Sequence, residues 1–202
     1  TPGVSYGGIA ERYYTVGQYM KEVKDVSKAM AAAGDSYICD EYLNAMGSPE
    51  AESVYVLHDL NNDGIEEFFI GLKFNYDIPY YVIYDVYTWK DGRAYQLMRG
   101  IGYRNGSCKI CENGVIEDNY SGSAWDGQTL YHILPEGGIE LETIDSVSSR
   151  RDGTVQSYYH WNELIDENTL QTILEQYQPE SVTYVDCNRE TIEQLRLSGI
   201  RK

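Results

Sequence analysis

The spacing of hydrophobic residues changes twice along the chain. Over residues 9–33 apolar side chains recur at steps of three and four, with charged side chains between them. This pattern predicts an amphipathic helix, which Gly34 would end. Asp35 or Ser36 can then cap a second, shorter helix. We therefore expect residues 1–50 to form a helical N-terminal segment.

From residue 53 the hydrophobic period becomes two, which is typical of strands with two unlike faces. The predicted strands are 53–58, 68–74, 80–89, 94–99, 107–111, 115–120, 128–134, 139–147 and 154–161. Asp-Gly or Asn-Gly pairs at 91–92, 113–114 and 152–153 supply the positive φ angles of tight hairpin turns. Residues 53–161 are therefore predicted to form a long antiparallel β-meander.

The helical period returns in the tail, residues 162–202. Asp166 is suited to cap one helix and Asn188 a final short one, and residues 182–185 favour a short strand between them. Helices, a meander and helices again predict an α+β fold with the terminal helices packed on one face or end of the sheet. Because no Pro-, Gly- or Ser-rich linker separates these segments, we expect residues 1–202 to form a single domain.

The charge of the chain narrows its possible partners. Its 202 residues are 42% hydrophobic, and 32 acidic residues face 16 basic ones, which gives a formal net charge of -16. Such a field repels phosphate backbones and anionic membranes and attracts metal cations. No apolar run approaches the roughly 18 residues of a transmembrane helix. We therefore expect no nucleic-acid partner and no transmembrane segment.

Four cysteines, Cys39, Cys108, Cys111 and Cys187, permit three disulfide connectivities. Cys108 and Cys111 lie three residues apart in a predicted strand, so their side chains should point to opposite faces. A bridge or a zinc ion between these two residues is geometrically unfavourable. The remaining alternatives are buried thiols or a bridge from this pair to Cys39 or Cys187.

The segment that starts at Asp59 carries oxygen-bearing side chains at alternate positions around a glycine. Alternate side chains of a curled loop can converge on a hard cation, which takes six to eight oxygen ligands. Without an ion, carboxylates this close would repel one another, unless the loop is a well-solvated, Asx-rich hairpin. The predicted calcium ligands are the side chains of Asp59, Asn61, Asp63 and Glu67 and the backbone carbonyl of Ile65.

This loop differs from an EF-hand, because its twelfth position is Ile70 and both flanks are predicted strands. It resembles the calcium loops of FG-GAP and VCBS repeats, which read Asp-x-Asn-x-Asp-Gly-x-x-Asp/Glu before an apolar strand ending in Gly. Here the match runs from Asp59 to Gly71 and occurs once. The resemblance therefore implies the structural calcium loop but not the propeller fold of those families.

The wider layout is similar to a group of uncharacterised exported or lipid-anchored proteins of gut Firmicutes. In these proteins a helical segment precedes one such loop, then a Tyr-Asp-x-Tyr stretch, a Cys-Glu-Asn-Gly-like turn and a helical tail. The corresponding segments here are residues 84–87 and 111–114 and the tail from Asn162. The resemblance implies an extracellular or cell-surface protein, and we expect its signal segment to be absent from this chain, which starts at Thr1 without an apolar leader.

We find no catalytic constellation in the sequence. No nucleophile elbow is present, and the three histidines, His58, His132 and His160, have no carboxylate partner fixed by local spacing. Among 32 acidic residues no pair is singled out for a carboxylate-based hydrolase. We therefore expect a non-catalytic domain, and the hydrolase is the weakest of the alternatives.

A carbohydrate-binding module is the alternative from another functional class, with a polysaccharide or a surface protein as its ligand. Aromatic rings on one exposed face could stack on sugar rings, although alternation along strands should also bury many of them. The candidate rings are Tyr80, Tyr81, Tyr84, Tyr87, Trp89, Tyr103, Tyr120, Trp125, Tyr131, Tyr158, Tyr159 and Trp161.

Overall fold

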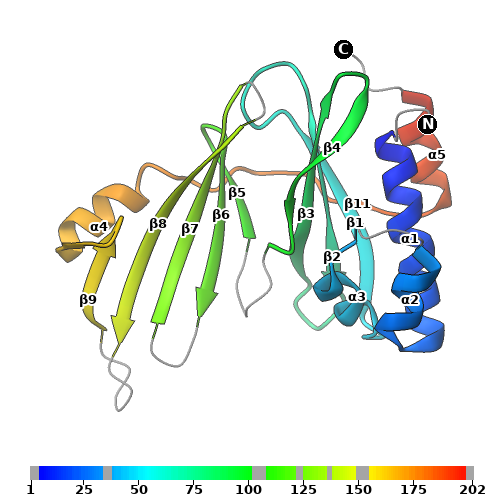
Figure 1. Cartoon of the computed structure of the whole chain (residues 1–202), viewed down its shortest axis with the longest axis horizontal. Helices are drawn as coiled ribbons and strands as arrows, with labels where there is room; N and C mark the ends of the chain where they lie inside the picture. The colour runs from blue at the N-terminus through cyan, green and yellow to red at the C-terminus, as the bar shows by residue number, and fades with distance from the viewer. Residues whose placement is uncertain are drawn as a thin grey trace. The chain divides into compact units, whose positions relative to one another are not determined.

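A computed structural model describes residues 5–33, 38–101, 108–121, 125–135, 138–148 and 155–198. Within these ranges the chain forms five helices and eleven strands in two antiparallel sheets, which confirms the α+β class (Figure 1). The helices are α1 (Tyr6–Val23), α2 (Val26–Ala33), α3 (Asp40–Met46), α4 (Glu167–Leu174) and α5 (Arg189–Ser198).

The predicted meander is divided between the two sheets. The first sheet has the order β11-β1-β2-β3-β4 and the second the order β10-β9-β8-β7-β6-β5. The strands of the first sheet are β1 (Ala51–His58), β2 (Glu67–Phe74), β3 (Tyr80–Lys90), β4 (Arg93–Arg99) and β11 (Val185–Asp186). Those of the second are β5 (Cys108–Cys111), β6 (Val115–Ser121), β7 (Trp125–Ile133), β8 (Ile139–Ser148), β9 (Val155–His160) and β10 (Glu163–Ile165).

The chain separates into two compact units, one around each sheet. The first comprises Thr1–Asp59, Gly64–Ile101 and Val182–Lys202, and the second comprises Leu60–Asp63 and Gly102–Ser181. The polypeptide therefore passes from one unit to the other four times. Whether the two units unfold together, as expected of a single domain, stays a prediction.

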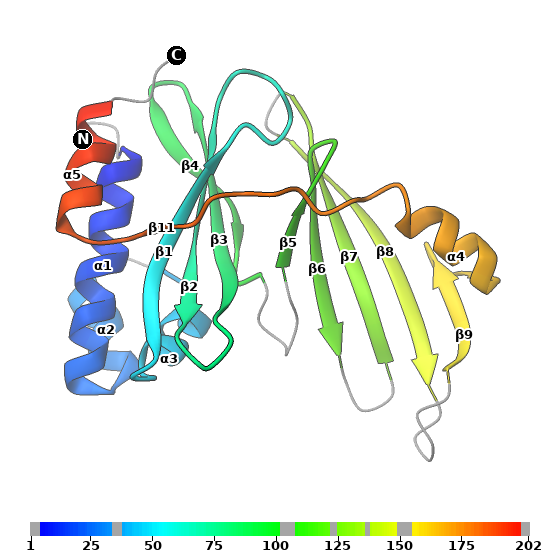
Figure 2. The same ribbon diagram turned by 180° about the vertical axis from the view of Figure 1, so that it is seen from behind.

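In the first unit, helices cover one face of the sheet (Figures 1 and 2). Alternate residues of β2, Phe68, Ile70 and Leu72, join the buried cluster on that face. Tyr13 of α1 and Tyr42 of α3 enter the same cluster, and their rings meet edge to face at 5.0 Å. The alternation of the strands predicts only the sheet side of this core. The helices supply the aromatic side chains of its other side.

The helix predicted over residues 9–33 is wrong in its continuity, because the chain breaks it at Lys24. This residue has a left-handed φ of 50°, and its N–H donates to the carbonyl of Met20. Asp25 then caps α2 by accepting from the backbone N–H of Lys28 at 3.1 Å. The Asp25 cap therefore starts a new helix at a point where the hydrophobic spacing of the sequence shows no interruption.

The second predicted helix exists but begins later than expected. Gly34, Asp35 and Ser36, which we expected to form the boundary, lie outside the described residues. The cap of α3 is Cys39, whose Sγ accepts from the N–H of Tyr42 at 3.4 Å. Sulfur is a weak acceptor, so cysteine gives little indication of a helix start in a sequence.

The strands of the meander agree with the prediction to within a few residues. The turns at 91–92 and 113–114 have positive φ at all four residues, as the Asp-Gly and Asn-Gly pairs require, and the pair at 152–153 lies outside the described ranges. Strand β10 was missed, because residues 162–165 follow a turn at Trp161 and Asn162, whose φ angles are 52° and 63°. Neither turn residue is glycine, so the sequence gives no hairpin signal there.

The resemblance to FG-GAP loops implied that the strand ends at Gly71, but it does not. Strand β2 continues to Phe74, and its register with β3 shifts between Ile70 and Gly71. A Cβ atom at Gly71 would lie 2.1 Å from the carbonyl oxygen of Val82. Glycine is needed here because the two backbones approach too closely for any side chain.

In the second unit, α4 packs against the sheet through Leu170, which joins Leu130 and Ile144 in a buried cluster. Asp166 caps this helix as predicted, accepting from the N–H of Thr169 at 2.7 Å. Asn188 likewise caps α5. None of the helices within the described ranges is long and apolar enough to cross a membrane.

Candidate functional site

The predicted calcium loop joins β1 to β2, so both of its flanks are strands, as expected. A carboxylate oxygen of Asp59 accepts from the backbone N–H of Gly64 at 2.9 Å. Asn61 Oδ1 accepts from the N–H of Asp63 at 3.2 Å, and Asn61 Nδ2 donates to Asp63 Oδ2 at 3.2 Å. Asn62 and Gly64 are left-handed, with φ of 57° and 85°. Side-chain bonds and two left-handed residues thus curl this loop tightly.

Glu67, the last predicted ligand, is placed differently. It is the first residue of β2, its side chain is fully buried, and Oε1 accepts from the hydroxyl of Thr88 on β3 at 3.0 Å. The structure therefore ties one oxygen of Glu67 to the first sheet. Ile65 follows Gly64 directly and precedes β2.

The loop is shared by the two units along the sequence: Asp59 and Ile65 belong to the first, and Asn61 and Asp63 to the second. Within the second unit, Asn61 Nδ2 also donates to the carbonyl of Leu134 at 3.0 Å. Across the described ranges, no three His, Cys, Asp or Glu side chains are arranged to hold a metal ion. Any ion in this loop would therefore depend on amide, carbonyl and water oxygens as well as carboxylates.

A second carboxylate of interest lies in the Tyr-Asp-Val-Tyr segment. Asp85 is fully buried on β3, accepts from the hydroxyl of Tyr13 and accepts from the N–H of Gly100 at 2.9 Å. The hydroxyls of Tyr13 and Tyr87 lie 2.9 Å apart. Burial raises the pKa of Asp85 to about 6, although the bonds from Tyr13, Gly100 and Cys39 partly oppose that rise. These bonds join α1, β3 and the chain after β4, which gives Asp85 a role in the fold.

Two of the three histidines have a carboxylate partner that sequence spacing did not reveal. His132 Nε2 lies 2.8 Å from Glu142 Oε2, and His160 Nε2 lies 2.7 Å from Glu142 Oε1. Tyr177, beyond α4, donates to Glu142 Oε2 at 2.8 Å. Burial alone would raise the pKa of Glu142, but the bonds from Tyr177, His132 and His160 outweigh it and lower the pKa.

We call Glu142, His132, His160 and Tyr177 the Glu142 cluster. The register of the consecutive strands β7, β8 and β9 brings its glutamate and histidines together. An ionised carboxylate only accepts, so each imidazole must carry its proton on Nε2. The ring of Tyr177 packs edge-on against that of His132, with centroids 5.6 Å apart. This arrangement ties three strands to the segment after α4, and no nucleophile contacts it among the residues that the structure describes.

Only part of the predicted aromatic face lies in the cores. Tyr84 and Tyr87 are buried, and Trp89 packs against the first core. Tyr103 and the side chain of Trp125 lie outside what the structure describes. Tyr80, Tyr81 and Trp161, in contrast, are 48%, 38% and 49% exposed.

The largest ring stack lies on the hairpin between β2 and β3. Phe74, Tyr76 and Tyr80 are nearly parallel, with Phe74 and Tyr80 centroids 4.8 Å apart and Tyr76 and Tyr80 centroids 5.9 Å apart. The Phe74 and Tyr76 centroids are 6.3 Å apart, so the three distances form a triangle and the rings overlap only in part. Phe74 is buried, whereas Tyr76 and Tyr80 are 50% and 48% exposed. This group therefore offers two open rings for sugar stacking.

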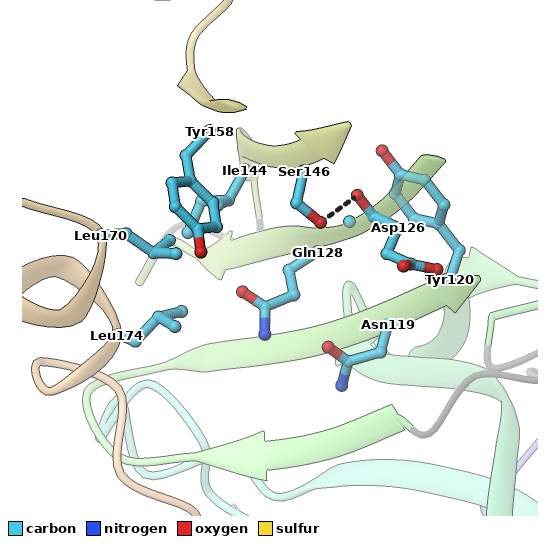
Figure 3. A pocket seen from close by; sticks show the side chains of 10 residues that line it. Asn119, Tyr120, Asp126, Gln128, Ile144, Ser146, Tyr158, Leu170 and Leu174 are labelled. Atoms are coloured by element: carbon cyan, nitrogen blue, oxygen red, sulfur yellow. Dashed lines mark hydrogen bonds between the residues drawn. The ribbon is translucent and has the colours of Figure 1, made fainter. Parts of the chain in front are cut away.

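The second unit contains a cavity of about 340 Å³ between its sheet and α4 (Figure 3). Its lining comes from β6, β7, β8, β9 and α4. The lining residues are Asn119, Tyr120, Asp126, Gly127, Gln128, Ile144, Ser146, Tyr158, Leu170 and Leu174. Sequence analysis named Tyr120 and Tyr158 as candidate rings but did not find the polar side chains between them.

The cysteines are arranged as thiols. Cys108 and Cys111 are the end residues of β5, opposite Asp118 and Val115 of β6, so they point to opposite faces as predicted. Like Cys39 and Cys187 they are buried and not bonded to another cysteine. Burial raises the pKa of Cys111 to about 11 and that of Cys187 to about 12, which disfavours the reactive thiolate.

Comparison of the chain with protein-family models, with curated proteins and with solved structures finds no match. The resemblances to FG-GAP and VCBS loops and to exported Firmicutes proteins therefore stay predictions. Function has to be argued from the loop, the cluster and the cavity themselves.

Proposed function

We propose that this chain is a non-catalytic domain of the cell exterior or cell surface whose loop from Asp59 to Ile65 binds calcium as a structural ion. The observation that carries the proposal is the bond from Gly64 N–H to Asp59, which curls the loop back on its first carboxylate. Asn61 and Asp63 are linked within the same turn. Oxygen-bearing side chains at alternate positions of such a curl are the ligand type that calcium takes.

The negative charge of the molecule favours a cation as the ligand of this loop. Asp59 and Asp63 lie in a chain with a net charge of -16, so the loop has a cost of repulsion that a divalent ion removes. The proposed ligands are Asp59, Asn61, Asp63 and the carbonyl of Ile65, with water at the remaining positions. Glu67 Oε1 accepts from Thr88, and a role for Glu67 as a further ligand, directly or through water, stays a prediction that Glu67→Gln tests by calcium titration.

The test is calorimetric titration of chelator-stripped protein, with thermal unfolding in parallel. Calcium that binds only the folded state should raise Tm by several degrees, and a chelator should reverse the shift. Asp63→Ala, which removes the ligand oxygens, should abolish both signals. Asp77→Ala, which removes another exposed acidic side chain from the next hairpin, should abolish neither. Absence of heat and of a Tm shift at millimolar calcium would show that the loop is only an Asx-rich hairpin.

Carbohydrate binding is the second candidate function, although the exposed aromatic face first considered for it does not favour it. Tyr80, Tyr81 and Trp161 are exposed, but Tyr84 and Tyr87 are buried, which leaves fewer open rings than the sequence predicts. The cavity beside α4 offers a different basis for it.

A further inference from the structure

Polar side chains occupy core-facing positions at one end of the second sheet. Asn119 of β6 pairs with Gln128 of β7, and Gln128 pairs with Ile144 of β8. Paired residues share a face, and Ile144 lies in the buried cluster beneath α4. The strand pattern predicts apolar side chains on a face that a helix covers. Amides at these positions break that rule, and such breaks concentrate at functional sites.

These side chains line an open hollow in the face of the sheet beside α4, and not an enclosed cavity. Its volume of about 340 Å³ lies in the range of small-ligand sites. In Figure 3, Gln128 lies in the middle of the group, with Leu170 and Leu174 of α4 on one side and Asn119 on the other. Apolar groups thus form one wall and polar groups the floor, which is the usual composition of a ligand site.

Some polar side chains of the cavity are held by hydrogen bonds within the protein, and others are not. Asn119 Nδ2 donates to Glu117 Oε1 at 2.7 Å, and Ser146 Oγ donates to the carbonyl of Asp126 at 3.2 Å, so these two side chains are oriented. The Gln128 amide and the Tyr158 hydroxyl, in contrast, make no hydrogen bond within the ranges that the structure describes. A half-buried amide needs partners for its donors and acceptors, which water or a ligand must supply.

The chemistry of the lining selects the ligand class. Amides and hydroxyls both donate and accept hydrogen bonds, as sugar hydroxyls do. Among the residues that the structure describes, the lining holds no Lys, Arg or His, and it includes the carboxylate of Asp126, so this part of it offers nothing to pair with an anion. The ring of Tyr158 and the two leucines can cover the C–H face of a sugar. We propose that this cavity binds a neutral sugar ring, with Gln128 as its central hydrogen-bonding group.

The test is saturation-transfer NMR on the whole chain, followed by calorimetric titration of any sugar that responds. The probes are the methyl glycosides of glucose, galactose and mannose, together with N-acetylglucosamine, each at millimolar concentration, and glucuronate serves as the anionic comparison. At least one neutral sugar should receive saturation and shift the side-chain amide signals of Gln128, while glucuronate should not. If none of the neutral sugars responds, or if glucuronate binds best, the proposal is wrong.

Variants separate recognition from folding. Gln128→Leu restores an apolar residue to a helix-covered face, so it should fold with an equal or higher Tm and yet weaken sugar binding about tenfold or more. Gln171→Leu, on the exposed side of α4, is the matched control and should bind like the wild type. Ser146→Ala is a second cavity variant in case Gln128→Leu does not fold. Unchanged affinity in a folded cavity variant would overturn the proposal, and this result is independent of calcium.

Discussion

Asp85 is a single residue whose protonation is coupled to folding. Its pKa is raised from 3.8 to about 6 by burial, so the folded protein favours the protonated carboxyl. The stabilisation from this proton is complete below the unfolded pKa and is lost as the pH rises through the folded pKa. At neutral pH the fold therefore holds a buried charge that Tyr13 and Gly100 only partly compensate.

Asp85→Asn should remove this pH dependence. Between about pH 4 and pH 7 the free energy of unfolding of the wild type should fall relative to that of the variant, by an amount on the order of 2 to 3 kcal/mol. Urea unfolding at both pH values measures the difference, and Asp77→Asn controls for the loss of one exposed charge. Parallel pH profiles for the wild type and Asp85→Asn would mean that Asp85 keeps an ordinary pKa.

For single residues, the sequence indicated those of the calcium loop but not the carboxylates whose partners come from distant parts of the chain. Asp59, Asn61 and Asp63 could be selected because their alternate spacing is local. Asp85 and Glu142 depend on partners from other strands and helices, which only the sheet register brings close. Glu67 met the spacing rule, and its bond to Thr88 is a further partner that the spacing did not indicate.

At the scale of elements, alternation located nearly every strand, because half-buried strands repeat their pattern over a whole segment. Ends and breaks were harder to predict. Lys24 interrupts a helix that the hydrophobic period continues, and β10 begins after a turn that contains no glycine. The helix break and the turn before β10 both need a left-handed backbone at residues other than glycine. Such residues seldom adopt it, so the sequence does not indicate these positions.

Gly71 gives an element-scale prediction. In Gly71→Ala the new methyl group would meet the backbone of Val82, which cannot move without disturbing the ladder of β2 and β3. We expect a loss of about 3 kcal/mol or more in the free energy of unfolding, beyond the usual cost of overpacking. Gly138→Ala, whose Cβ would lie 3.4 Å from a flexible leucine side chain, should cost far less in the same urea titration. Equal stability of the two variants would contradict the close approach.

At the scale of the whole molecule, the chain crosses four times between its two units, so neither is a simple stretch of sequence. Such interleaving favours unfolding in one cooperative step. The prediction of one domain rested on the absence of a linker, and the division into two sheets was not foreseen, because a meander has the same pattern whether its strands form one sheet or two.

Cooperative unfolding can be measured separately in each unit. Trp89 reports on the first unit, and Trp125 and Trp161 report on the second. In urea, fluorescence of Trp89→Phe and of a variant lacking the other two tryptophans should give the same midpoint once differences in stability are corrected by circular dichroism. Two separate midpoints would show that the units are independent domains.

The pairing of β1 with β11 affects how this protein folds while it is being synthesised. Val54 pairs with Asp186, and α1 packs against α5 through the ion pair of Glu11 with Arg196. During synthesis the edge of β1 at Val54 and Tyr55 therefore stays unpaired until more than half of the chain has followed it, and an open edge invites pairing with other chains. The second unit can be complete while the first still waits for its last strand and helix, so this stage is where a chaperone would have most to protect.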